Sequence, residues 1–328
     1  MGHFIFNSFI RFDSINRVRS TVTAGDRQAQ GIPMDQTRTP HPMPSDASRR
    51  HLLGGLGAIA GLAATGAAVA QTGAASGDAK PFKGKVAIVT AARNNQGRAY
   101  AVALARLGAD VMLHFHRAET QDQNDETARL VRAQGVRVAT ALGDLGEVSN
   151  VKKVFDTAQS QFGRIDMVVN TVGMIIKKPL AEVTEADYER SQRANTKAAL
   201  FVMQEAARRL ADGGRIIHIG TSLTAGSAPG YALYAGTKAP AEEFTRMLAK
   251  EIGKRGITVN NIAPGPLDNT FFHAAETPQS AAFAANLSVA GRLGREADIT
   301  PVVEFLASPQ AQWMTGQVLW VNGGYLTR

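Results

Sequence analysis

The chain has 328 residues, enough for one large or two ordinary domains, and its 44% hydrophobic and 20% charged residues are typical of a folded globular protein. The net charge of +8 is a modest excess spread along the chain, which favours a solvated surface over a nucleic-acid interface, so we expect no nucleic-acid partner. The sequence contains no cysteine, which excludes disulfides, cysteine-ligated zinc and thiol catalysis.

The N-terminal segment, residues 1–70, differs in composition from the rest of the chain. Arg49 and Arg50 precede a weakly apolar run, and residues 68–70 form an A-x-A-like cleavage site. The pattern resembles a twin-arginine signal, so we expect a cleaved signal peptide and an exported, periplasmic protein with no stable membrane span after processing. The alternatives are a retained membrane helix, or a chance pattern in a cytoplasmic protein. Residues 71–82, rich in Gly, Ala and Ser, predict a linker.

From residue 83 to residue 328, short apolar runs alternate with segments of helical periodicity. This alternation predicts a single α/β domain, a Rossmann-type doubly wound parallel sheet, which binds ligands at the carboxyl ends of its strands. The predicted strands are residues 86–89, 111–113, 136–142, 165–170, 215–219, 257–262 and 318–321. The predicted helical segments are residues 99–107, 126–133, 184–210 and 232–252.

Residues 90–99 follow the first predicted strand and open a helix, which is the position of a phosphate-binding turn. Such a turn usually has three glycines, but here only Gly97 is present, and Ala91 and Asn95 stand in the places of the other two. Because asparagine tolerates positive φ, Asn95 is a suitable substitute, whereas Ala91 predicts an ordinary φ. The alternative is a strand–helix loop that binds no ligand.

The end of the second predicted strand indicates which dinucleotide the turn would bind. An NAD site usually has Asp or Glu there, and residues 113–117 contain no carboxylate. Arg117, helped by Arg93, could pair with a 2′-phosphate, so the segment favours NADP(H) unless Arg117 is only a surface charge. His114 and His116 lie on one face of the strand, but no third ligand accompanies them and we expect no metal.

Tyr234 and Lys238 are four residues apart at the start of a predicted helix and therefore fall on one of its faces. A tyrosine hydroxyl with a pKa of about 10 is a poor acid–base group at neutral pH. An adjacent ammonium favours the phenolate and lowers that pKa, which makes the pair a candidate for proton transfer. The alternative is an ordinary pair on a helix surface.

Further motifs surround this pair in order along the chain. They are Asn170-Thr171-Val172-Gly173, Asn195, Thr221-Ser222, Pro264-Gly265 and Asn322-Gly323-Gly324. With these motifs and the Tyr234–Lys238 pair, residues 83–328 resemble the short-chain dehydrogenase/reductase family. Residues 113–117 are similar to the corresponding part of the pteridine reductases within that family, which use NADPH.

The resemblance implies roles for the candidate catalytic residues. Tyr234 would donate a proton to the substrate oxygen in reduction, or remove it in oxidation. Lys238 would lower the pKa of Tyr234 and hold the nicotinamide ribose, and Asn195 would organise a water that links Lys238 to solvent. A hydroxyl thirteen residues before the tyrosine would polarise the carbonyl; that residue is Thr221, Ser222 is one position off, and either can donate the hydrogen bond.

The resemblance also implies cofactor contacts and an assembly. Asp144 would reach the adenine and Leu267 would lie against the nicotinamide. The residues expected to contact NADP(H) are Arg93, Gln96, Gly97, His116, Arg117, Asp144, Asn170, Gly173, Tyr234, Lys238, Pro264, Gly265 and Leu267. A homo-oligomer, commonly a tetramer, is implied, in which residues 184–210 and 232–252 pack against their copies.

Two functions agree with these features. One is an enzyme that transfers hydride between NADP(H) and a small carbonyl or alcohol substrate, with Tyr234 as the acid–base group. The other is a non-catalytic NADP(H)-binding sensor on the same fold, which the depleted glycine turn and the displaced serine favour. Residues 174–176, Tyr231 and residues 271–272 indicate either an apolar lid over a substrate pocket or ordinary packing.

Overall fold

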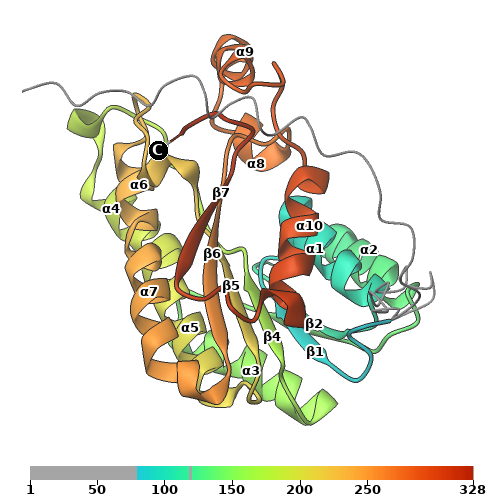
Figure 1. The fold of residues 1–328 in the computed structure, drawn as a ribbon. Helices are drawn as coiled ribbons and strands as arrows, with labels where there is room; N and C mark the ends of the chain where they lie inside the picture. Colours follow the sequence, from blue (N-terminus) through green and yellow to red (C-terminus); the bar gives the residue numbers. More distant parts are fainter. Residues whose placement is uncertain (1–79, 118–119, 328) are drawn as a thin grey trace, which may run out of the picture. The chain divides into compact units, whose positions relative to one another are not determined.

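The computed structural model describes residues 80–117 and 120–327, which belong to the second of the two units into which the chain divides, residues 71–328. A seven-stranded parallel sheet runs through it in the order β3-β2-β1-β4-β5-β6-β7 (Figure 1). The strands are β1 (Val86–Val89), β2 (Asp110–Phe115), β3 (Val138–Leu142), β4 (Met167–Asn170), β5 (Arg215–Ile219), β6 (Thr258–Pro264) and β7 (Gln317–Val321). The order reverses between β1 and β4, which confirms the predicted doubly wound sheet.

Helices cover both faces of this sheet (Figure 1). One face carries α1 (Asn95–Arg106), α2 (Gln121–Arg132) and α10 (Glu296–Ala307), and the other carries α3 (Val148–Phe162), α5 (Ala198–Arg209) and α7 (Pro240–Ile252). The shorter helices are α4 (Glu185–Ser191), α6 (Ala232–Lys238), α8 (Thr270–His273) and α9 (Pro278–Asn286). Short 3-10 turns span Leu180–Glu182, Ser222–Thr224, Gly253–Arg255 and Pro309–Ala311. Because α8 and α9 follow β6, they stand beyond the carboxyl ends of the strands.

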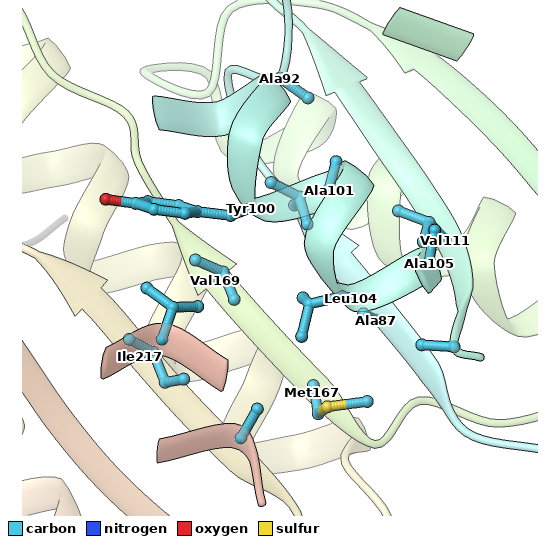
Figure 2. Close-up of a cluster of buried hydrophobic side chains, with 14 of the residues drawn as sticks. Ala87, Ala92, Tyr100, Ala101, Leu104, Ala105, Val111, Met167, Val169 and Ile217 are labelled. Carbon is cyan, nitrogen blue, oxygen red and sulfur yellow. The ribbon is translucent and has the colours of Figure 1, made fainter. Parts of the chain in front are cut away.

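The apolar runs become central strands because both of their faces are covered. In β1, Ala87 points to the core beneath α1, while its neighbour Ile88 points to the core beneath α3 and α5. Figure 2 shows the first of these cores, where Tyr100 and Leu104 of α1 lie over Val169 of β4. All five side chains are fully buried, so the two cores hold the strand ends, and the loops that follow them, in place.

Both long helical segments expected from the sequence are interrupted. The segment 184–210 consists of α4, a π-helical turn at Gln192–Lys197, and α5. Such turns widen a helix locally and are frequent at functional sites. The segment 232–252 is divided into α6 and α7 at Pro240, because proline has no backbone N–H to continue the hydrogen-bond ladder.

The domain begins earlier than the sequence indicated. Phe82, assigned to the linker 71–82, is only 3% exposed and packs in the core beneath α1, and its N–H donates to the Leu107 carbonyl at 2.9 Å. The end of the predicted linker is therefore part of the fold. The sequence did not indicate this, because a single aromatic residue after a Gly/Ala/Ser stretch has no periodicity of its own. Residues 1–79, with the expected signal segment, lie outside the described residues. None of the described helices is long and apolar enough to cross a bilayer.

Candidate active site

Two cavities at the carboxyl ends of the strands share part of their walls. The first, named here the turn cavity, has a volume of about 550 Å³ and is bounded by the turn after β1 and by the ends of β2 and β4. The second, the lid cavity, has a volume of about 600 Å³ and lies between the segment after β5 and the α8–α9 segment. Gly220 and Tyr234 line both cavities, so groups bound in the two would approach each other beside Tyr234.

The turn after β1 is built on two left-handed residues, Ala91 with φ 47° and Asn95 with φ 45°. The positive φ at Asn95 is the conformation expected of a glycine substitute, but the ordinary φ expected at Ala91 is wrong. The chain has to reverse directly after β1, and the Ala91 N–H is held by the Nδ1 atom of His114 at 3.1 Å. Gly97 is needed for close approach, since a β carbon there would lie 2.5 Å from the Ala91 carbonyl oxygen.

His114, considered from the sequence only as a metal ligand, instead braces this turn. Its Nδ1 atom accepts from the Ala91 N–H, so its Nε2 atom carries the proton and donates to the Gly143 carbonyl at 2.7 Å. The side chain is fully buried, and burial lowers its pKa to about 4, which keeps the ring neutral. His116 lines the turn cavity, 3.9 Å from Asp144, so the two histidines contact different groups and do not share a ligand site.

Two arginines lie at the end of the turn cavity formed by the turn after β1 and the end of β2, named here its outer end. Arg93 and Arg117 line it, and neither guanidinium has an ion-pair partner among the described residues. Asp144 lines it as well, but Arg193 holds its carboxylate through two hydrogen bonds of 2.9 and 2.7 Å. Arg193 also pairs with Glu147 at 2.7 Å. Both carboxylates at this end are therefore engaged by Arg193, and Arg93 and Arg117 face the cavity without a carboxylate partner among the described residues.

Lys238 is buried at the inner end of the turn cavity. Its ammonium donates to the carbonyls of Val172 and Ile219 at 3.1 and 3.0 Å, which anchors it between the ends of β4 and β5. Burial lowers its pKa to about 8. A β carbon on Gly173 would lie 2.7 Å from the Lys238 Nζ atom, so a larger residue at position 173 would force the ammonium to move.

Tyr234 is buried at the junction of the cavities, and burial raises its pKa to about 12, while a hydrogen bond with Thr221 acts in the opposite direction. The family resemblance had implied a pKa lowered by Lys238. In the structure burial outweighs any such effect, and the Lys238 ammonium is held by backbone carbonyls. Of the two candidate hydroxyls, Thr221 faces Tyr234, whereas the Ser222 hydroxyl donates to the Ala263 carbonyl at 3.0 Å.

Asn170 and Asn195 line neither cavity, and both hold the framework behind them. Asn195 lies in the π-helical turn, and its amide exchanges two hydrogen bonds with the backbone of Met174, at 2.8 and 3.0 Å. Asn170 accepts from the Thr90 hydroxyl at 2.7 Å and pairs with the His218 ring at 3.1 Å, which links β1, β4 and β5. Both asparagines therefore position the chain after β4, which carries Gly173.

The other predicted site residues lie on the cavity walls. Those that line the turn cavity are Arg93, Gln96, Gly97, His116, Arg117, Asp144, Gly173, Tyr234 and Lys238. Those that line the lid cavity are Gln96, Thr221, Ser222, Tyr234, Pro264, Gly265 and Leu267. Residues brought together here come from six different loops, which agrees with a binding site at the strand ends.

The lid cavity has mostly apolar walls. Its apolar lining includes Ile175, Leu223, Pro229, Leu267, Phe271, Phe272 and Phe283. The expected apolar lid is thus partly present, with Met174 on the turn cavity instead and Ile176 on neither. Sequence reasoning missed Lys177 and Glu276, which also line the lid cavity and pair at 2.6 Å. No sequence signal could have found this pair, because its members are separated by 99 positions.

Comparison with known proteins identifies the family. Residues 91–326 match the protein-family model described as enoyl-(acyl carrier protein) reductase. An Arabidopsis thaliana protein named NADPH-dependent aldehyde reductase-like protein is 35% identical over 258 residues, which cover 75% of this chain and 96% of that protein. A Picea abies protein named short-chain type dehydrogenase/reductase is 37% identical over 251 residues, covering 74% of this chain and 92% of that protein. The chain belongs to the short-chain dehydrogenase/reductase family.

Solved structures agree with this assignment. A putative dehydrogenase from Burkholderia cenocepacia, solved with bound NADP, has a TM-score of 0.73 and 38% identity, and the match covers 76% of this chain and 96% of that one. A blue fluorescent protein from a metagenomic library, in complex with NADPH, has a TM-score of 0.72 and 33% identity, covering 75% of this chain and 100% of that one.

Proposed function

We propose that the protein is an NADP(H)-dependent oxidoreductase that transfers hydride between the cofactor and a carbonyl or alcohol group of a small molecule. The observation that carries this proposal is the position of Tyr234, which lies where the turn cavity meets the lid cavity. A proton donor at that junction suits a reaction between two ligands held in fixed orientation, one in each cavity. The names of the relatives, which include an NADPH-dependent aldehyde reductase-like protein, support the same reaction class.

The residues of the turn cavity fit NADP(H). Arg93 and Arg117, without a carboxylate partner among the described residues, present positive charge where a 2′-phosphate would be held. The two left-handed residues and Gly97 let the backbone at the start of α1 approach a pyrophosphate closely. Lys238 and Gly173, at the inner end of the cavity, would hold the nicotinamide ribose.

The chain's own residues would manage the proton and the substrate oxygen. When bound, the cofactor supplies or accepts the hydride. With a pKa raised to about 12 by burial, Tyr234 is protonated at neutral pH, which suits donation to the substrate oxygen during reduction. The Thr221 hydroxyl beside it would donate a second hydrogen bond to that oxygen. The Lys238 ammonium would stabilise the negative charge that Tyr234 acquires as its proton leaves.

A non-catalytic NADP(H) sensor is the second candidate. It is favoured by Ala91, which keeps a strained φ where the family's turn usually has glycine. A direct test separates the two functions. Purified protein with NADPH and a panel of neutral aldehydes and ketones should consume NADPH only if it is an enzyme. Tight NADPH binding without turnover on any member of the panel would favour the sensor.

We also propose a homo-oligomer and export. Large apolar side chains are exposed on the helices expected to meet their copies, with Leu200 of α5 39% exposed and Met247 of α7 56% exposed. A monomer seen by light scattering at micromolar concentration would contradict the assembly. The export proposal depends on the sequence alone, through Arg49, Arg50 and the apolar run that follows them.

A further inference from the structure

An ion pair forms part of the wall of the lid cavity. The Lys177 ammonium, on the segment after β4, lies 2.6 Å from the Glu276 carboxylate, on the segment between α8 and α9. The Glu276 side chain is only 4% exposed and that of Lys177 is 24% exposed. The Tyr231 hydroxyl donates to the second oxygen of Glu276, and the Lys177 ammonium lies 5.1 Å from the centre of the Tyr231 ring. Three segments distant in sequence therefore meet in one neutralised cluster.

This cluster stands close to the reacting position. The rings of Tyr231 and Tyr234 are edge to face with their centres 6.0 Å apart. Among the described residues that line the lid cavity, Lys177 and Glu276 are the members with a full charge at neutral pH, and the rest are apolar or neutral. A molecule in this cavity therefore meets no net charge, although two full charges of opposite sign lie in its wall.

We infer that the Lys177–Glu276 pair is a specificity determinant that selects uncharged carbonyl compounds. This inference rests on the proposed function, because it assigns a substrate class to the same cavity. A charged substrate would lose hydration and gain no net compensation, since each wall charge is already satisfied by the other. An uncharged substrate loses little hydration and contacts the apolar walls. Removing one member of the pair leaves the other uncompensated and creates a site for a substrate charge of opposite sign.

Two variants of nearly unchanged shape test the inference. Glu276→Gln removes the negative charge and leaves the Lys177 cation, while Lys177→Met removes the positive charge and leaves the Glu276 anion. The chain provides a matched control in Lys178→Met. Lys178 directly follows Lys177 and also forms an ion pair, with Asp187 of α4 at 2.7 Å, but it does not line the lid cavity. Thermal melting with NADPH present checks that each variant folds.

Two pairs of aldehydes of matched shape report on charge. The first pair is para-tert-butylbenzaldehyde, which is neutral, and para-trimethylammonio-benzaldehyde, which is cationic. The second pair is methyl para-formylbenzoate, which is neutral, and para-carboxybenzaldehyde, which is anionic. The measured quantity is the ratio of kcat/KM for the charged aldehyde to that for its neutral partner. Comparing this ratio between variants cancels the different intrinsic reactivities of the aldehydes.

The wild type and the Lys178→Met control should give the same low ratios for both charged aldehydes. Glu276→Gln should raise the ratio for the carboxylate by about tenfold or more and lower the ratio for the ammonium, and Lys177→Met should do the reverse. Two results would overturn the inference. One is unchanged ratios in both variants. The other is a rise of the anionic and the cationic ratio together in one variant, which would indicate that the pair only stabilises the cavity wall. If a single variant does not fold, the exchange Lys177→Glu with Glu276→Lys should restore the wild-type ratios, and a different result would also overturn the inference.

A binding measurement separates this inference from the proposed function. In Tyr234→Phe with bound NADPH, the dissociation constant of each aldehyde can be followed by the quenching of NADPH fluorescence. If the wild type reduces no aldehyde but these constants follow the same charge rule in the variants, the proposed reaction fails and the selectivity of the cavity stands. If aldehydes are reduced but neither the constants nor the kcat/KM ratios follow the rule, the inference fails and the reaction stands.

Discussion

A β carbon on Gly173 would lie 2.7 Å from the Nζ atom of Lys238. The same β carbon would lie 3.2 Å from the Oδ1 atom of Asn195, whose amide holds the adjacent backbone at Met174. Gly173, in the segment after β4, therefore leaves space that the buried ammonium occupies, and it does so without a positive φ. Its requirement is steric and arises only from contacts with residues distant in sequence.

Gly173→Ala should displace Lys238 and lower kcat by about tenfold or more, with a loss of about 1–3 kcal/mol in the free energy of unfolding from overpacking. Steady-state kinetics and chemical denaturation measure the two effects. Gly236→Ala is the matched control, because a β carbon on Gly236 of α6 meets no atom within 4 Å. Wild-type activity and stability in Gly173→Ala would contradict the steric role of Gly173.

Tyr234→Phe should abolish turnover and leave NADPH affinity near that of the wild type. The change removes only the hydroxyl that donates the proton, and the Lys238 ammonium keeps its bonds to the Val172 and Ile219 carbonyls. Single-turnover kinetics and a fluorescence titration with NADPH measure the two quantities. A variant that retains much of the wild-type rate would show that another group supplies the proton.

Arg117→Ala should reduce the preference for NADPH over NADH. A charge-assisted hydrogen bond to a phosphate is worth roughly 1.5–3 kcal/mol, so the loss in NADPH affinity should be on the order of tenfold or more, with little change for NADH. Calorimetric titration of both cofactors tests this. Arg132→Ala on α2, outside the turn cavity, is the control. Equal affinity of the wild type for the two cofactors would remove the basis for the assignment.

Ala91→Gly should stabilise the protein by up to about 1 kcal/mol. A left-handed conformation costs an L-residue other than glycine roughly 1–2 kcal/mol, and part of that gain is lost to the greater freedom of glycine in the unfolded chain. Ala92→Gly is the control, since Ala92 is fully buried and has no positive φ, and it should destabilise the protein. Equal or lower stability of Ala91→Gly in urea denaturation would contradict a strained turn.

Replacing Arg49 and Arg50 together by Lys should retain the protein in the cytoplasm with an uncleaved N-terminus. We expect the unchanged chain to be exported already folded with its cofactor, because NADP(H) is made in the cytoplasm and the twin-arginine route carries folded proteins. Cell fractionation and N-terminal sequencing measure location and cleavage. The same cytoplasmic location and intact N-terminus for both chains would refute the export proposal and leave the fold and site unaffected.

Local sequence patterns were enough to predict the fold class, the Tyr234–Lys238 pair and the cofactor. Apolar runs such as residues 86–89 predict buried parallel strands because both faces of such a strand are covered, and the structure confirms the doubly wound sheet. The Tyr234–Lys238 spacing places both side chains on one helix face, which depends only on the period of a helix. The absence of a carboxylate at residues 113–117 points to NADP(H), because the end of β2 is a position that the strand order already specifies.

Contacts between residues distant in sequence decided the detailed geometry of the site. Ala91 adopts a positive φ because His114 and the helix start constrain the turn, and Thr221 rather than Ser222 faces Tyr234 because the Ala263 carbonyl accepts from Ser222. The direction of the Tyr234 pKa follows from burial, which a spacing motif does not contain. The Lys177–Glu276 pair joins loops that follow β4 and α8, so only the packing of those loops brings the two charges together in the wall of the lid cavity.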